Sequence, residues 1–129
     1  MDMNTVVFIG IVVLVVWMLY SRFRPTKYLR SLNTTDFQSE IGKGKDRVLL
    51  DVREPGEYQT GCIPGAVNVP LSRLQQRLDE IPKDKEVLLY CRSGMRSKSA
   101  AKILHQKGYS RLAELQGGIS AWKGKLAKK

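Results

Sequence analysis

The chain has 129 residues, which is enough for one compact domain but too few to fill two hydrophobic cores. Its composition is that of a globular protein, with 43% hydrophobic and 26% charged residues, and 22 Lys and Arg against 12 Asp and Glu give a net charge of +10. The basic residues are scattered from Arg22 to Lys129 without a DNA- or RNA-reading motif, so the sequence does not indicate a nucleic-acid-binding protein.

The first predicted element is an uncharged, almost wholly apolar stretch from Met3 to Ser21. In a helix that rises about 1.5 Å per residue, this stretch extends for roughly 28 Å, close to the hydrocarbon thickness of a bilayer. A secretory signal peptide would need a cationic start and a small-residue cleavage site, whereas this chain starts with Asp2 and leaves the stretch through Tyr20. We therefore predict a single transmembrane anchor over residues 1–21.

A basic segment follows the predicted span, and its cationic residues are Arg22, Arg24, Lys27 and Arg30. An anionic membrane surface attracts such residues, and basic residues close to a span are retained on the cytoplasmic side. We expect residues 22–32 to form a basic juxtamembrane linker that Pro25 separates from the helix. The protein is thus predicted to be a single-pass membrane protein whose domain faces the cytoplasm.

Residues 33–126 are predicted to form one α/β domain, because short apolar runs alternate with helical patterns. Continuous apolar runs are typical of strands covered on both faces of a parallel sheet. The predicted strands are 48–52, 66–69, 87–90 and 111–115, and the predicted helices are 34–41, 72–81 and 97–106, with a strand-to-helix turn at Gly117 and Gly118. Residues 127–129 are expected to be a frayed tail.

Cys91 directly follows the strand predicted at 87–90 and precedes a polar, glycine-containing loop. In an open α/β sheet, ligands collect beyond the carboxyl ends of the strands, so this cysteine lies where such folds bind substrates. Backbone N–H groups at the start of the next helix stabilise an anion, and Arg92 and Arg96 add two positive charges. Because such surroundings lower the pKa of a thiol from about 8.5 and the thiolate is the attacking species, we predict that Cys91 is a nucleophile.

The remaining residues that can carry chemistry are few. His105, the only histidine, lies well inside the helix predicted at 97–106, and we interpret it as a surface or packing residue rather than a base. Cys62 and Cys91 are too few to staple a secreted fold and too far apart in sequence for a zinc ribbon. We therefore expect free thiols in a reducing compartment and no metal site.

Four segments together resemble a single-domain rhodanese. They are Asp51 to Glu54, Gly61 to Asn68, the Cys91 loop (residues 91–96), and Leu115 to Trp122. The resemblance covers residues 33–126 in the family's order and spacing. It implies an open five-stranded parallel sheet flanked by helices, which one transmembrane helix precedes in this chain.

The resemblance also implies an activity. Rhodaneses take a sulfane sulfur from thiosulfate or another donor, carry it as a cysteine persulfide, and pass it to a thiol, to cyanide or to a protein, without a cofactor. By position, Cys91 is implied to be the catalytic residue. The implied substrate-binding residues are Arg92, Ser93, Gly94, Met95, Arg96 and Ser97. The two arginines favour a small anionic sulfur donor, and the charged residues Asp51, Arg53, Glu54 and Glu57 are implied to form internal ion pairs that brace the loops.

This sequence departs from the family pattern at one position, because the family commonly has His where Cys62 follows Gly61. One interpretation is a tolerated loop substitution. The other is a second redox thiol, which resolves the persulfide or forms a disulfide with Cys91.

Two alternative functions remain open. The first alternative to the anchored sulfurtransferase is a membrane-tethered sulfur carrier or adaptor that serves one protein partner. The second is a cysteine phosphatase-like enzyme, which would need five residues between the cysteine and its arginine. Here Arg96 is the fifth residue after Cys91 and the sixth is Ser97, so the loop is one residue too short to surround a phosphoryl group.

Overall fold

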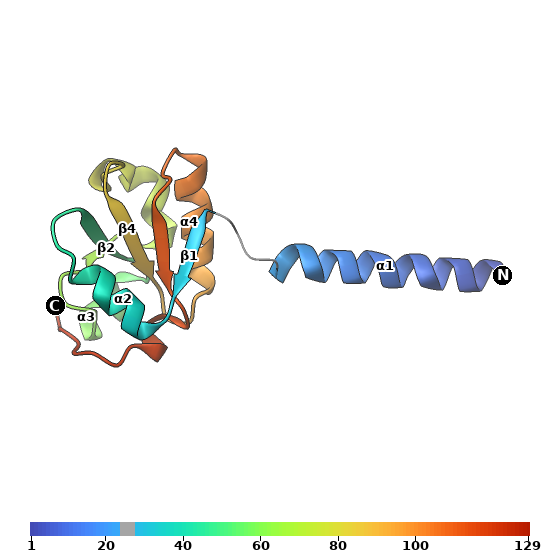
Figure 1. The fold of residues 1–129 in the computed structure, drawn as a ribbon, viewed down its shortest axis with the longest axis horizontal. Helices are drawn as coiled ribbons and strands as arrows, with labels where there is room; N and C mark the ends of the chain where they lie inside the picture. Colours follow the sequence, from blue (N-terminus) through green and yellow to red (C-terminus); the bar gives the residue numbers. More distant parts are fainter. Residues whose placement is uncertain (24–27) are drawn as a thin grey trace.

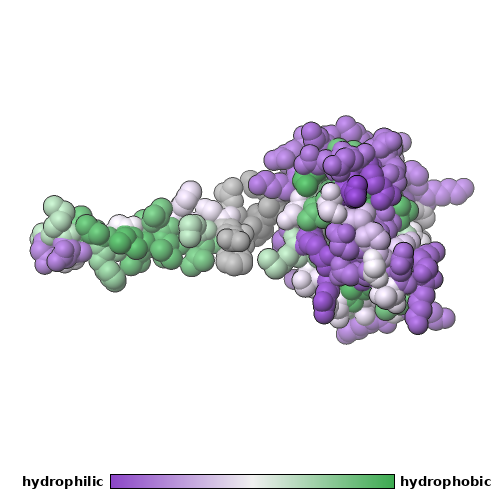
Figure 2. All heavy atoms as spheres, turned by 180° about the vertical axis from the view of Figure 1, so that it is seen from behind, coloured by the Kyte–Doolittle hydropathy of each residue, from purple (hydrophilic) through white to green (hydrophobic). Residues whose placement is uncertain are grey.

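The computed structural model describes residues 1–23 and 28–129. Helix α1 (Met3–Phe23) begins after Asp2, whose carboxylate accepts a hydrogen bond from the backbone N–H of Thr5 at 2.8 Å. The segment Met3–Ser21 has a mean hydropathy of 2.3 and none of it is buried, and Figure 2 shows its apolar surface. By length and composition α1 meets the requirement for a membrane span, which a signal sequence also meets.

The predicted exit from the span is only partly open to comparison. Arg24, Pro25 and Lys27 lie outside the described residues, and so does the side chain of Arg22.

The domain is built on an open sheet of five parallel strands in the order β1-β5-β4-β2-β3 (Figure 1). The strands are β1 (Leu29–Leu32), β2 (Arg47–Asp51), β3 (Val67–Asn68), β4 (Glu86–Tyr90) and β5 (Leu112–Leu115). The predicted α/β fold, a five-stranded parallel sheet flanked by helices and preceded by one apolar helix, is confirmed.

Helices cover both faces of the sheet. One face carries α2 (Thr34–Ile41) and the short helix η2 (Gly118–Ala121), and the other carries η1 (Leu71–Glu80) and α4 (Met95–Gln106). Alternate residues of β4 serve the two layers: Leu88 packs with Phe37 of α2, and Leu89 packs with Leu104 of α4. Because both faces are buried, the strands have continuous apolar sequences.

The fifth strand lies where the sequence predicted only a linker. Leu29–Leu32 form β1, which pairs with β5 in a register that runs from Leu29 opposite Leu112 to Leu32 opposite Leu115. The linker prediction for residues 22–32 is therefore corrected for these four residues. An edge strand this short carries no recognisable period of its own, and only its pairing partner makes it a strand.

Two helices differ in detail from the sequence prediction. The helix expected at 72–81 is a 3₁₀ helix, interrupted at Arg77, where φ is −118° and ψ is 22°. Helix α4 begins at Met95, before the predicted start at Ser97, so Arg96 lies in its first turn. A third helix, α3 (Pro55–Thr60), was not predicted, although proline at the first helical position is a recognised start signal.

The carboxyl terminus is paired rather than frayed. Cys62 and Ala127 exchange two backbone hydrogen bonds of 2.8 and 2.7 Å, and the N–H of Lys129 donates to the carbonyl of Gln59 at 3.2 Å. The tail expectation for residues 127–129 was thus wrong, because a loop far away in the sequence supplies the partners.

Candidate active site

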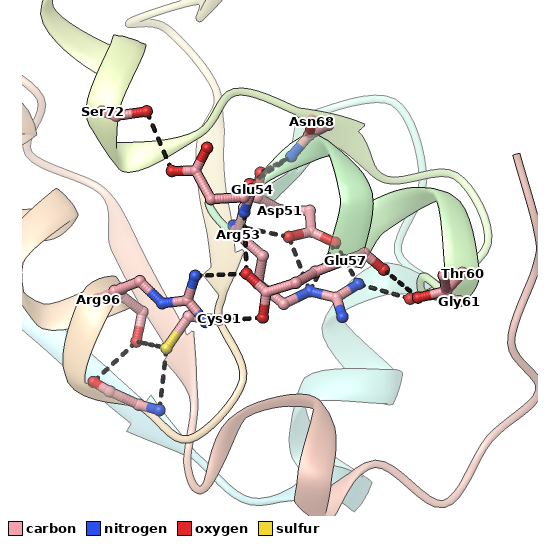
Figure 3. Close-up of polar contacts among 12 residues, drawn as sticks. Asp51, Arg53, Glu54, Glu57, Thr60, Gly61, Asn68, Ser72, Cys91 and Arg96 are labelled. Carbon is pink, nitrogen blue, oxygen red and sulfur yellow. Dashed lines mark hydrogen bonds and ion pairs between the residues drawn. The ribbon is translucent and has the colours of Figure 1, made fainter.

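Cys91 follows the last residue of the central strand β4, at the carboxyl edge of the sheet. Its side chain is almost fully buried, with 1% of the residue exposed. The backbone N–H of Gly94 donates a hydrogen bond to Cys91 Sγ at 3.0 Å, and Ser97 Oγ lies 3.7 Å from the sulfur (Figure 3). The loop thus folds back over the sulfur and aims hydrogen-bond donors at it.

These donors act on the charge state of the thiol. Burial raises the pKa of Cys91, but hydrogen bonding with the backbone and the side chain of Ser97 and with the N–H groups of Gly94 and Ser93 outweighs it, and the pKa is lower than that of an ordinary cysteine. The sequence predicted this direction. The main stabilising groups, however, are donors of the loop and of the first turn of α4 rather than the two guanidinium groups.

Two glycines allow the loop to take this shape. Gly94 has φ of +106°, a left-handed conformation that side chains rarely adopt. Gly118 lies so close to the loop that a Cβ there would meet the carbonyl oxygens of Cys91 and Arg92 at 2.5 Å. The N–H of Ile119 donates to the Cys91 carbonyl at 2.8 Å, so η2 fixes the backbone of Cys91.

Arg96 is already engaged in an ion pair. Its guanidinium donates from Nη1 to Glu57 Oε1 at 2.6 Å and from Nη2 to Glu57 Oε2 at 3.0 Å. The carboxylate comes from α3 and the guanidinium from α4, and Figure 3 shows them meeting beside Cys91. Hydrogen bonding to Arg96 lowers the pKa of Glu57 to about 2.

Asp51 and Arg53 form a second ion pair beneath the loop. Both residues are buried, and Arg53 Nη2 donates to Asp51 Oδ2 at 2.7 Å and to the carbonyl of Gly61 at 2.5 Å. Glu54 accepts a hydrogen bond from Ser72 Oγ at 3.0 Å. Apart from Glu54, these charged residues form internal ion pairs, as the sequence resemblance implied.

Glu114 is a residue of the site that sequence reasoning missed. It lies on β5 with 1% of its surface exposed, and its carboxylate accepts hydrogen bonds from Ser97 Oγ at 2.8 Å and pairs with Lys98 Nζ at 2.9 Å. It links β5 to the first turn of α4 through Ser97, whose Oγ lies 3.7 Å from the Cys91 sulfur. The sequence contains one signal that could have identified Glu114, because a carboxylate inside an otherwise apolar strand is rarely buried without a partner.

The outer rim of the loop is formed by residues that point to solvent. Arg92 and Ser93 are exposed, and Met95 is 76% exposed. Gly94 and Ser97, by contrast, are buried with the sulfur. The structure thus divides the predicted substrate-binding residues into an inner set around the sulfur and an outer set at the surface.

Cys62 is a free, buried thiol, like Cys91. It lies where the carboxyl-terminal tail pairs with the chain, and its neighbour Tyr58 donates a hydrogen bond to the carbonyl of Ala66 at 2.8 Å. The role of Cys62 as a second redox thiol stays a hypothesis.

Within residues 1–23 and 28–129, no group of three or more His, Cys, Asp or Glu side chains is arranged to hold a metal ion. A cavity of about 580 Å³ lies between α2 and the carboxyl-terminal segment, and Ile63, Pro64 and Trp122 are among its lining residues. None of its lining residues belongs to the Cys91 loop.

Comparison with known proteins gives a consistent result. A family model described as a rhodanese-like domain matches residues 33–125. The uncharacterized protein YqhL of Bacillus subtilis is 37% identical over 126 residues, which cover 98% of each chain. A sulfurtransferase of Allochromatium vinosum is 39% identical over 94 residues, or 73% of this chain and 88% of the relative. The crystal structure of a rhodanese-related protein from Thermoplasma volcanium has a TM-score of 0.70 and 31% identity, and the match covers 78% of this chain and 99% of that one.

Proposed function

The chain belongs to the rhodanese-like domain family, and from that premise we propose that it is a sulfurtransferase that carries sulfur as a persulfide on Cys91. The observation that carries this proposal is the buried Cys91 sulfur, which accepts a hydrogen bond from the N–H of Gly94 and lies next to Ser97. Hydrogen-bond donors around the sulfur stabilise a thiolate before the reaction and a persulfide anion after it.

The proposed first step is attack on a sulfane donor. The Cys91 thiolate attacks the outer sulfur of the donor, a new S–S bond forms, and the bond between the two sulfur atoms of the donor breaks. With thiosulfate the leaving group is sulfite, which keeps the electron pair of the broken bond. The overall charge is conserved, and no external oxidant or reductant takes part.

The second step returns the enzyme to its starting state. A thiolate or cyanide attacks the outer sulfur of the Cys91 persulfide, and the Cys91 thiolate leaves. The acceptor is a thiol, cyanide or a protein. A sulfur carrier for one protein partner would use the same first step and differ only in the second.

We further propose that residues 1–21 anchor the protein in a membrane by a single pass and that the domain faces the cytoplasm. The apolar helix α1 supports the anchor, and the basic residues after it support the orientation. In this proposal residues 22–32 connect the span to the domain and also contain β1, residues 33–126 form the rhodanese-like domain, and residues 127–129 follow it.

The sulfurtransferase proposal is tested by intact-mass analysis of the full-length chain after incubation with thiosulfate or a persulfide. We expect a gain of one sulfur atom that is absent in Cys91→Ser and retained in Cys62→Ser. The absence of an adduct with every sulfane donor would refute the proposal. The same two variants test the redox hypothesis, because unchanged recovery of Cys62→Ser from peroxide by a dithiol would exclude Cys62 as a resolving thiol.

A further inference from the structure

Three cationic side chains of the site are paired with carboxylates, whereas Arg92 is exposed at the rim of the loop. Arg96 pairs with Glu57 at 2.6 Å, Lys98 with Glu114 at 2.9 Å, and Arg53 is paired below the loop. In the sequence alone, Arg92 and Arg96 are two positive charges close to Cys91, and they favour an anionic donor. The structure places the Glu57 carboxylate on the guanidinium of Arg96, beside Cys91 (Figure 3).

Glu57 is held firmly in this position. Its Oε1 also accepts a hydrogen bond from the backbone N–H of Glu54 at 3.1 Å. Two donors therefore hold Oε1, and Arg96 Nη2 holds Oε2. Hydrogen bonding to Arg96 lowers its pKa to about 2, and Glu57 therefore stays ionised across the physiological range. The side chains of Arg96 and Glu57 are 34% and 32% exposed, so a ligand at the loop can reach them.

The Glu57 carboxylate opposes a dianion that approaches Cys91 in two ways. The dianion is repelled by the charge of Glu57, and it can use the two Arg96 donors only by displacing Glu57 from them. Because Glu57 belongs to the same chain, it competes at an effective concentration of roughly millimolar or higher. Inorganic thiosulfate must overcome this competition at every turnover.

We propose that Glu57 occupies the position next to Arg96 that an anionic donor would take, and thereby favours persulfide donors, whose leaving group is a singly charged thiolate, over doubly charged inorganic donors. This inference rests on the proposed function and names its substrate class: a persulfide on a cysteine within a peptide or protein. The exposed Met95 and Arg92 at the rim lie where the body of such a donor would contact the enzyme.

The chemistry of such a donor is balanced without a further reactant. The Cys91 thiolate attacks the outer sulfur of the donor persulfide, the donor S–S bond breaks, and the donor cysteine leaves as a thiolate. One S–S bond replaces another, so Cys91 is oxidised to the persulfide while the donor is reduced to the thiolate, and no external oxidant or reductant is needed. The persulfide group brings at most one negative charge into the loop, whereas thiosulfate brings two.

The test compares two donors on the full-length chain in a neutral detergent: thiosulfate, and the persulfide of N-acetylcysteine amide. The variant is Glu57→Gln, which removes the charge. The matched control is Glu54→Gln, because Glu54 belongs to the same turn and its charge also acts on Arg96, yet it bonds to Ser72 instead. We expect the kcat/KM ratio of thiosulfate to persulfide to rise at least about tenfold in Glu57→Gln and less than about twofold in Glu54→Gln, in line with the strength of charge-assisted hydrogen bonds.

An unchanged ratio in Glu57→Gln, including an equal fall of both rates, would overturn the proposal and leave Glu57 as a structural brace. An equal rise in both variants would overturn it as well. Failure of the proposed function looks different, because then neither donor adds sulfur to Cys91 in the unsubstituted protein.

A second measurement needs no variant. Sulfate at millimolar concentration is expected to leave the alkylation of Cys91 by iodoacetamide unchanged relative to chloride at equal ionic strength. Clear protection by sulfate would show that the position next to Arg96 is free and would refute the inference.

Discussion

At the scale of single residues, the reactivity of Cys91 depends on hydrogen bonds rather than on nearby formal charge. The groups that lower its pKa are the N–H groups of the loop and the backbone and side chain of Ser97, and together they outweigh the effect of burial. The chain has one histidine, His105, which is exposed on α4 and stacks on Tyr28 with ring centroids 4.1 Å apart. The interpretation of His105 as a surface residue agrees with this exposure.

The contribution of Ser97 can be measured directly. Its hydroxyl lowers the pKa of Cys91, so Ser97→Ala is expected to raise that pKa and to slow alkylation at pH 7 several-fold. The measurement is the pH dependence of iodoacetamide labelling in a Cys62→Ser background. The matched control is Ser99→Ala, an exposed serine on the same helix whose hydroxyl donates to the carbonyl of Met95. A downward shift of the labelling profile in Ser97→Ala would contradict the prediction.

At the scale of elements, the site is assembled from segments that are far apart in sequence. Cys91 follows β4, Glu57 belongs to α3, and Glu114 belongs to β5. The turn before η2 touches the loop backbone most closely, because the N–H of Ile119 donates to the Cys91 carbonyl. The geometry of the donors around the sulfur therefore depends on the packing of one loop on another.

This packing predicts the effect of a methyl group at Gly118. A Cβ there lies 2.5 Å from the Arg92 carbonyl, so Gly118→Ala must displace the loop and is expected to reduce sulfur transfer more than about tenfold. The control is Gly65→Ala, since Gly65 also has positive φ but nothing within 4 Å of its Cβ position. Gly65→Ala should cost about 1–2 kcal/mol of unfolding free energy with little loss of activity. Equal activity of the two variants in a transfer assay, with stability followed by urea unfolding, would contradict this account.

At the scale of the whole molecule, an apolar helix stands outside the core of a small α/β domain. Its residues Met3–Ser21 find no partner within the described chain that buries them. Leaving such a helix in water is unfavourable, since burial of apolar surface yields roughly 25 cal/mol per Å². A bilayer would remove this surface from water.

The proposed anchor makes a testable prediction. The full-length chain is expected to stay in the membrane fraction after washing with alkaline carbonate, whereas a variant that starts at residue 28 should be soluble and should still accept sulfur on Cys91. In right-side-out vesicles the domain should be protected from added protease, and in inverted vesicles it should be cleaved. A mature chain that begins after Tyr20, detected by mass, would identify α1 as a signal sequence instead.

Much of the fold was open to prediction from the sequence. The apolar runs of β2 and β4 and the helical pattern of α4 are local signals, because burial on both faces and burial on one face leave different periods in a chain. The same holds for Cys91, which ends a strand and precedes a glycine-containing loop. The edge strand β1 and the pairing of Ala127 with Cys62 were not predictable, since each depends on a partner far away in sequence.

The sequence by itself thus determined the fold class, the apolar amino-terminal segment and the position of the candidate nucleophile. Only the tertiary structure decided the electrostatics of the site. From the sequence, Arg96 is expected to be an unpaired positive charge. In the folded chain, Glu57 of α3 pairs with Arg96, and Glu114 of β5 accepts a hydrogen bond from Ser97. Charge acts over a few ångströms in space, and sequence separation does not report that distance.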